Sequence, residues 1–165
     1  MQNKISDMVF CISNDGKLKI DKKPIENMLC YAQDTIEKYE AGGVILGRFI
    51  KDSNNIVIDV ITEPMKEDIR TRTRFKRGKK KHQKRIDEIW EESEGTCNYI
   101  GEWHTHPEDH PSPSTTDIKS WNKILRNDVF LSKYLYFIIV GTKSIEIWEG
   151  NSENLKIKKL IHGKE

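Results

Sequence analysis

The chain has 165 residues, of which 36% are hydrophobic and 33% are charged, and its formal net charge at pH 7 is +2. This balance is typical of one globular domain, which we expect over residues 1–165. It excludes a membrane-spanning protein, because no stretch approaches the roughly 20 consecutive apolar residues that cross a bilayer. The cysteines Cys11, Cys30 and Cys97 form no Cys-x-x-Cys pair, so we expect reduced thiols in a cytoplasmic protein without a secretory signal.

Runs rich in β-branched residues predict four strands in the first half of the chain. They are residues 8–13, 17–20, 42–50 and 55–64. Apolar residues at helical spacing predict a helix over residues 23–39, between the second and the third strand. We expect residues 51–55 to join the later two strands as a hairpin, and residues 63–78 to be irregular.

The second half of the chain predicts two helices and four strands. Residues 79–93 predict a charged helix that ends at Gly95 and carries Ile86, Ile89 and Trp90 on one face. The other helix is residues 114–126, and the strands are residues 97–106, 134–141, 144–150 and 154–161. Hairpins outnumber crossovers in this order, which favours a mixed α/β domain on a largely antiparallel or mixed sheet.

Basic residues gather in one segment of the chain. Residues 70–85 hold ten of the 28 Lys and Arg residues and no acid, so the remainder of the chain is acidic. The segment is either a solvated surface or a binding surface for an acidic protein partner or for nucleic acid. Phe75 is its only aromatic residue, which leaves little surface on which bases stack and disfavours nucleic acid.

The stretch GEWHTHPEDHPSPSTTD, residues 101–117, places His104 and His106 two positions apart on a predicted strand. Side chains at positions i and i+2 point to one face of a strand, so both imidazoles reach one point. Histidine nitrogens are common zinc ligands. Asp117 follows a proline-rich loop and can supply a third ligand from the first turn of the next predicted helix.

Three alternatives remain open for these residues. His104 on its own is more often a half-buried structural histidine than a metal ligand. Ser114 and Asp117 resemble a helix start in which the serine and the acid cap each other. Glu102 lies on the same strand face as both histidines and competes with Asp117 as the third ligand.

A hydrolytic zinc site also needs a carboxylate that takes a proton from water and passes it to the leaving amine. Glu40 lies between the first predicted helix and the next strand, and Gly42 and Gly43 follow it. Those glycines let two backbone segments approach closely, which suits an acid pushed into a site. Glu37, one helical turn earlier, is the rival candidate, although it falls on the charged side of the predicted helix.

These residues carry a resemblance to a known family. The spacing of Glu40, His104, His106, Ser114 and Asp117 matches, without a gap or a substitution, the motif of the JAMM (JAB/MPN-plus) zinc metalloproteases. The resemblance extends over nearly the whole chain. It implies an α/β (α+β) fold of the MPN/JAB type, in which helices flank a curved mixed β-sheet with a layering like that of cytidine deaminases.

The resemblance also implies a role for each residue of the motif. The residues that it implies as ligands of one Zn²⁺ per chain are His104, His106 and Asp117. By the same resemblance Glu40 is the general acid and base, and Ser114 helps to hold the tetrahedral oxyanion. Glu102 is then a neighbour of the site and not a ligand.

Residues 70–121 are similar to the small stand-alone JAB peptidases of bacterial CBASS antiphage operons, which accompany a cGAS-like nucleotidyltransferase. The likeness implies a deubiquitinase-like isopeptidase that acts in deconjugation. Its protein substrate carries the C-terminus of such a nucleotidyltransferase, or of a ubiquitin-like protein, joined to a target by an amide bond. Residues 62–78 then cover the extended tail of the substrate, with Arg72, Arg74 and Phe75 as substrate-binding residues.

Other function classes fit the sequence less well. A zinc deaminase needs a His-x-Glu and a later Pro-Cys-x-x-Cys, and the chain has neither. A second alternative is a nucleic-acid-binding protein related to DNA-repair-associated JAB members, and only the basic segment favours it. A third is a non-catalytic MPN scaffold, but such domains typically lack one or more zinc ligands, and this chain keeps the residues for all of them. His82, His110 and His162 have no role in these interpretations, and we expect them at the surface.

Overall fold

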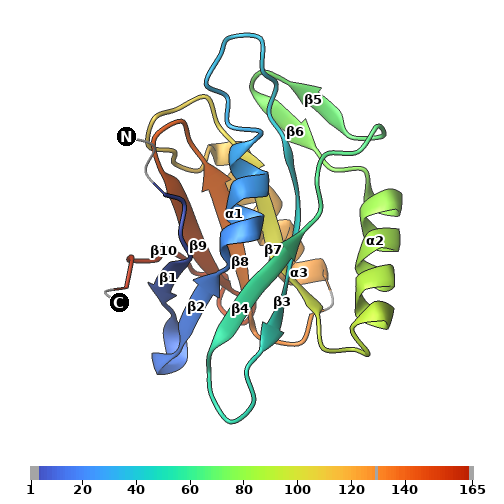
Figure 1. The fold of residues 1–165 in the computed structure, drawn as a ribbon, viewed down its shortest axis with the longest axis vertical. Coiled ribbons are helices and arrows are strands. Elements are labelled where there is room, and N and C mark those ends of the chain that lie inside the picture. The colour runs from blue at the N-terminus through green and yellow to red at the C-terminus, as the bar shows by residue number, and fades with distance from the viewer. Residues whose placement is uncertain (1–3, 129, 164–165) are drawn as a thin grey trace.

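The structure is a computed structural model that describes residues 4–128 and 130–163. In this part of the chain, eight strands form one sheet and two further strands form a separate hairpin (Figure 1). The strands are β1 (Met8–Cys11), β2 (Lys17–Ile20), β3 (Gly42–Phe49), β4 (Ile56–Ile61), β5 (Ile69–Thr71), β6 (Arg74–Lys76), β7 (Asn98–Thr105), β8 (Tyr134–Val140), β9 (Ile145–Asn151) and β10 (Ile157–Lys159). The α-helices are α1 (Lys22–Leu29), α2 (Lys79–Glu92) and α3 (Thr115–Asn127).

The large sheet has the strand order β1-β2-β4-β3-β7-β8-β9-β10. Two neighbouring pairs among the described strands, β2 with β4 and β7 with β8, are parallel, and the other pairs are antiparallel. The hairpins β3–β4 and β8–β9 form as predicted. The prediction of a mixed sheet flanked by helices is therefore confirmed, and β7 lies in its middle.

Helices cover both faces of the sheet, as the alternating side chains of β8 show. Tyr136, Ile138 and Val140 belong to the same buried cluster as Ile25 and Met28 of α1. The β8 residues on the opposite face, in the cluster with α3, are Leu135, Phe137 and Ile139. In Figure 1 α1 lies in front of the sheet and α3 behind it, which is the predicted layering.

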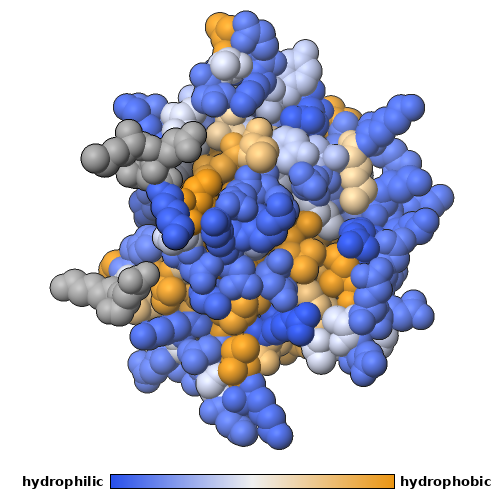
Figure 2. Space-filling model, in the orientation of Figure 1, coloured by the Kyte–Doolittle hydropathy of each residue, from blue (hydrophilic) through white to orange (hydrophobic). Residues whose placement is uncertain are grey.

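The helix α2 lies on the same side of the sheet as α3 but packs farther along it. Ile89 is buried against Val44 and Cys97, and the outward side of the helix is hydrophilic (Figure 2). Trp90 was predicted on one face with Ile86 and Ile89, but it does not join them in the core, because 54% of it is exposed. Its ring lies against Gly95, which has a φ of 78° and turns the chain after the helix, as expected of that glycine.

The predicted helix over residues 23–39 is too long. The helix α1 ends at Leu29, and residues 30–41 follow without regular secondary structure. Gln33 explains the change, because its buried side-chain amide donates to the backbone carbonyls of Lys38 (3.2 Å) and Arg72 (2.7 Å). Ile36, which seemed to continue the apolar stripe, is 76% exposed and adds nothing to the core.

The prediction that residues 63–78 are irregular is also wrong. This segment contains the β5–β6 hairpin, closed at its base by the Asp68 carboxylate. The carboxylate accepts the backbone N–H groups of Met65 (2.7 Å) and Gly78 (2.8 Å). Strands of three residues with charged side chains show no apolar periodicity, so the sequence pattern gave no signal for them.

Strand ends differ from the prediction where polar groups redirect the chain. The first strand stops at Cys11, because Ser13–Asp15 form a 3-10 turn in which the Ser13 backbone N–H and hydroxyl both donate to the buried carboxylate of Glu149. The last strand was predicted over residues 154–161, but only Ile157–Lys159 pair with β9.

The three thiols are free, and among the described residues no helix has the length and apolar character to cross a membrane.

His82 is not at the surface as expected but fully buried. Its Nδ1 lies 2.7 Å from the Thr62 hydroxyl, and its Nε2 lies 3.0 Å from an oxygen of Asp68, whose side chain is also buried. This polar cluster of Thr62, Asp68 and His82 therefore ties α2 to the residue after β4 and to the base of the β5–β6 hairpin. His110 and His162 are exposed, as predicted.

Because Asp68 satisfies several buried donors at once, Asp68→Ala is expected to lower the free energy of unfolding by about 3 kcal/mol. Urea unfolding followed by circular dichroism measures this loss. The exposed neighbour Glu67 provides the matched control, and Glu67→Ala is expected to change the same quantity by less than about 0.5 kcal/mol. A loss at Asp68 no larger than that of the control would show that the cluster does not hold the hairpin.

Candidate metal centre

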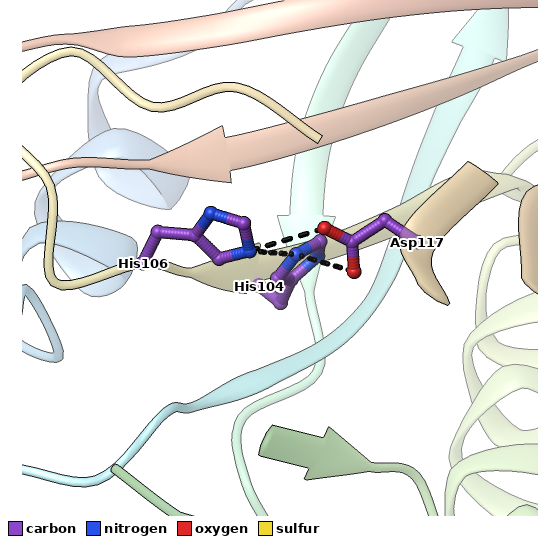
Figure 3. A group of neighbouring side chains, drawn as sticks. All are labelled: His104, His106 and Asp117. Atoms are coloured by element: carbon purple, nitrogen blue, oxygen red, sulfur yellow. Dashed lines mark hydrogen bonds and ion pairs between the residues drawn. The ribbon is translucent and has the colours of Figure 1, made fainter. Parts of the chain in front are cut away.

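His104 and His106 lie at the carboxyl end of β7 and turn toward the same point (Figure 3). Their Nε2 atoms are 3.0 Å apart. The backbone N–H of His106 donates to the Val140 carbonyl (3.0 Å), so the pairing with β8 continues past the end of the strand. The same-face expectation from the sequence therefore holds, and the central strand of the sheet presents both imidazoles.

Asp117 reaches the histidines from the first turn of α3. Its carboxylate oxygens lie 3.2 Å from Nε2 of His104 and 3.1 Å from Nε2 of His106. Trp121 and Leu125 follow at steps of four residues, on the same helix face, and both are buried in the core. Their packing turns this face of α3 toward the sheet and brings Asp117 with it.

Ser114 and Asp117 also cap the helix, as the alternative interpretation expected. The Ser114 hydroxyl accepts the Asp117 backbone N–H (3.0 Å), and the Asp117 carboxylate accepts the Ser114 backbone N–H (2.8 Å). The two interpretations are compatible, because one carboxylate oxygen approaches His104 while the other serves the cap and His106. The cap thus fixes the orientation of the carboxylate.

The three side chains suit a metal ion. One ligand atom from each of His104, His106 and Asp117 lies within 4.8 Å of the others. Tetrahedral zinc with bonds of about 2.0–2.2 Å separates its ligand atoms by roughly 3.3 Å, close to the distances here. Burial disfavours the charged form of Asp117, but hydrogen bonds from the two histidines outweigh it and hold the pKa of this carboxyl well below its usual range. The set offers two nitrogens and one anionic oxygen, and catalytic zinc sites typically combine three such protein ligands with one position for water or substrate.

Glu108 is a functional candidate that the sequence interpretation missed. Its carboxylate lies 3.0 Å from Nδ1 of His106. A carboxylate on one ring nitrogen orients the imidazole and leaves the other nitrogen for a metal. The signal available in the sequence was its position two residues after His106, but this position alone does not show the direction of the side chain.

Glu40 lies beside this cluster with its carboxyl buried, whereas its rival Glu37 is exposed. An oxygen of Glu40 is 4.0 Å from Nε2 of His106. Burial raises the pKa of Glu40 to about 7, against the opposing effect of the imidazoles. A carboxyl with such a pKa both takes up and releases protons near neutrality.

Gly42 and Gly43 allow the close approach that the sequence suggested. A Cβ atom on Gly42 would lie 2.5 Å from the Trp103 carbonyl oxygen and 2.7 Å from the ring of Phe75. A Cβ atom on Gly43 would lie 2.2 Å from the Thr62 carbonyl oxygen. Any larger residue would push β3 away from its neighbours and lift the β5–β6 hairpin.

Glu102, the alternative third ligand, lies outside the cluster. Its carboxylate forms an ion pair with the guanidinium of Arg77, and both side chains are largely buried. A carboxylate occupied in this way is not free for a metal at His104.

The three predicted substrate-binding residues lie on the β5–β6 hairpin and its turn, but they face different ways. Arg72 donates to the backbone carbonyls of Thr35 (2.8 Å) and Lys38 (3.2 Å) and so ties down residues 30–41. Arg74 is exposed. Phe75 lies against Gly42, one strand away from the histidines.

Thr105 and Gln33 support the site from the other face of β7, and the sequence interpretation did not identify them. The buried Thr105 hydroxyl accepts the Ala41 backbone N–H (3.0 Å) and donates to the Gln33 side-chain carbonyl (2.9 Å). These bonds join the strand that carries the histidines to the residue after Glu40. Thr105 carried a signal, since its position between two same-face residues predicts a buried side chain on the opposite face.

Comparison with known proteins gives consistent results. Residues 23–151 match the family model described as prokaryotic homologs of the JAB domain. The chain is 34% identical over 156 residues to a protein of Escherichia coli (strain TW11681) named "CD-NTase/cGAS isopeptidase", covering 94% of this chain and 95% of that protein. A Vibrio cholerae protein of the same name is 37% identical over 147 residues, with 89% of each chain covered.

Two further matches are weaker in coverage or identity. A Sinorhizobium fredii protein named "Probable metalloprotease y4qB" is 36% identical over 89 residues, which is 53% of this chain and 54% of that protein. The solution structure of protein DSY2949 from Desulfitobacterium hafniense superposes with a TM-score of 0.57 at 16% identity, covering 88% of this chain and 92% of that one, and supports the fold alone. The resemblance inferred from the motif is thereby confirmed, and the chain belongs to the prokaryotic homologs of the JAB domain as an enzyme of the JAMM metallopeptidase class.

Proposed function

We propose that this protein is a single-domain, zinc-dependent isopeptidase of the JAMM type. It would hydrolyse the amide bond that joins the C-terminus of a cGAS-like nucleotidyltransferase, or of a ubiquitin-like protein, to its target. The observation that carries the proposal is the convergence of His104, His106 and Asp117 beside the buried carboxyl of Glu40. The names of the relatives from Escherichia coli and Vibrio cholerae support the substrate class.

In this proposal His104, His106 and Asp117 hold one zinc ion. Bound zinc supplies a Lewis acid for the amide carbonyl and lowers the pKa of water. Glu40 takes a proton from the attacking water and delivers it to the nitrogen of the leaving amine, so that the carboxyl ends the cycle as it began. Its raised pKa of about 7 matches both transfers.

Ser114 is proposed to stabilise the oxyanion that forms on the carbonyl oxygen. Its hydroxyl oxygen accepts a backbone N–H within the cap, which leaves the hydroxyl proton available for donation. A donor aimed at developing negative charge is worth several kcal/mol in other hydrolases. The capping box holds the serine in place for this role.

The hairpin is proposed to contact the extended tail of the substrate. Arg74 is exposed there and Phe75 lies over the strand next to the histidines, so both are placed to meet a chain that enters the site. Arg72 contributes through the loop that it ties down. The exposed positive charge of the segment suits a protein substrate with acidic or carboxylate groups.

The test uses a defined conjugate in which the nucleotidyltransferase C-terminus is linked to a lysine side chain, beside a linear fusion of the same two proteins. The zinc-loaded enzyme is expected to release both parts of the isopeptide-linked conjugate as intact proteins. The sum of their two masses is then larger than the mass of the conjugate by one water molecule. No release from either substrate would contradict a peptidase role. A DNA affinity that falls steeply with salt would then favour the nucleic-acid-binding alternative.

A further inference from the structure

The backbone of Glu40 is held on both sides by one strand of the hairpin. The Glu40 N–H donates to the Thr71 carbonyl (2.7 Å), and the Glu40 carbonyl accepts from Nε of Arg70 (2.7 Å). Both partners belong to β5, so the peptide on each side of Glu40 is fixed to the same short strand. Glu40 itself belongs to no helix or strand. These two hydrogen bonds take the place of the backbone hydrogen bonds that a helix or a strand would provide.

The guanidinium of Arg70 is not occupied by an acid. None of the ion pairs within 4.0 Å among residues 4–128 and 130–163 includes Arg70, and its Nε donates to the Glu40 carbonyl. A charged donor strengthens a hydrogen bond to a neutral carbonyl roughly twofold compared with a neutral donor. The hydrogen bond from Arg70 to the Glu40 carbonyl is therefore strong, and no ion pair among the described residues competes for the guanidinium.

The strand that provides these contacts has a firm base. The buried Asp68, two residues before Arg70, is bound to the backbone of Gly78 and to His82, so β5 cannot shift along β6 without breaking buried hydrogen bonds. On the other side, Ala41 is bound to Thr105 of β7. The position of the Glu40 carboxyl thus depends on two contacts. The β5–β6 hairpin holds the backbone of Glu40 itself, and β7, the strand of the histidines, holds the next residue, Ala41.

We propose that Arg70 is a positioning residue for Glu40, and that the basic hairpin serves the reaction by holding the proton carrier at the metal centre. This inference rests on the function proposed above. Without the Arg70 bond the Glu40 peptide loses one of its two tethers to β5, and the carboxyl moves relative to His106. Displacements of about 1 Å in a catalytic group lower rates by up to roughly 100-fold.

The test compares Arg70→Met with Lys76→Met. Both variants remove one positive charge from the hairpin, but Lys76 is an exposed residue of β6 that lies opposite Ile69. The hydrogen bonds of the Glu40 backbone go to Thr71 and Arg70 instead. The first readout is exchange of the Glu40 backbone amide proton, measured by NMR on the metal-free protein. Arg70→Met is expected to accelerate it about tenfold, with the Val44 amide in β3 unchanged as an internal reference.

The second readout is the kinetics of conjugate hydrolysis with zinc-loaded protein. Arg70→Met is expected to lower kcat about 10- to 100-fold with little change in KM and with wild-type zinc content, whereas Lys76→Met is expected to keep the wild-type kcat and zinc content. Arg70→Lys keeps a charged donor and is expected to restore part of both the amide protection and kcat. If Arg70→Met does not fold, the same amide exchange and kinetics are measured on Arg70→Lys instead.

Several results would overturn the inference. Wild-type amide protection and kcat in Arg70→Met would show that Glu40 does not depend on this bond. A rise in KM alone would make Arg70 a substrate contact, and loss of zinc would place its effect on the metal centre. If the wild-type protein hydrolyses nothing, the proposed function fails, and the amide exchange still decides whether Arg70 holds Glu40.

Discussion

Glu40→Gln is expected to lower kcat for amide hydrolysis by about 10²–10⁴-fold, the usual contribution of a general acid and base. Glutamine has nearly the shape of glutamate, so the buried side chain keeps its place, but it neither accepts a proton from water nor returns one to the leaving amine. Zinc content and thermal stability are expected to stay at wild-type values, because Glu40 is not among the proposed ligands. Steady-state hydrolysis of the conjugate and elemental mass spectrometry together measure these quantities.

Glu37→Gln is the matched control for this experiment. Glu37 lies in the same irregular segment and loses the same charge, but its side chain is exposed, whereas that of Glu40 is buried. Its substitution is expected to leave kcat unchanged. Equal kcat values for Glu40→Gln and the wild type would remove Glu40 from the chemistry and leave the proton transfer to another group.

Asp117→Asn is expected to abolish stoichiometric zinc binding and hydrolysis together. The amide retains an oxygen that accepts the Ser114 backbone N–H, so the helix cap survives, but it lacks the negative charge that a zinc ligand supplies. The fold should therefore remain while the metal is lost. Elemental mass spectrometry after dialysis against equimolar zinc gives the content per chain.

Glu102→Gln separates the two candidates for the third ligand. Glu102 is paired with Arg77, and glutamine keeps a hydrogen-bond acceptor for that guanidinium. We expect this variant to bind as much zinc as the wild type. The ligand assignment would be wrong if Glu102→Gln lost the metal while Asp117→Asn retained it.

The proximity of the candidate ligands was predictable because each depends on local structure. His104 and His106 share a strand face through the two-residue period of a β-strand, and Asp117 is fixed by a capping box that can be read from Ser-x-x-Asp. Glu40 required more than periodicity. Its place next to Gly42 and Gly43 suggested a close approach, and the family motif then identified it.

The segments that the sequence did not predict are those held by distant partners. The helix predicted over residues 23–39 failed because the Gln33 side chain bonds to Arg72 and Thr105, which lie 39 and 72 residues away. The β5–β6 hairpin was missed for a related reason, since no apolar pattern marks it, and it is held by the Asp68 side chain and by the backbone of Glu40, which lies 30 residues from Arg70. Single-sequence patterns record which residues face a core, but they do not record side-chain bonds between remote segments.

His82 shows the same limit inside a correctly predicted helix. It stands among lysines at the start of α2, a composition that indicates a solvated face. The Asp68 carboxylate and the Thr62 hydroxyl bury it, and neither lies near it in the sequence. The buried polar groups of this protein are therefore the features that required the structure.

The most direct test of the metal centre is anomalous X-ray scattering, measured on both sides of the zinc absorption edge from crystals of the zinc-loaded wild-type protein. The structure predicts one strong anomalous peak between His104, His106 and Asp117, on the side that Glu40 faces. A peak beside Glu102, or none near the two histidines, would contradict this assignment of the metal ligands.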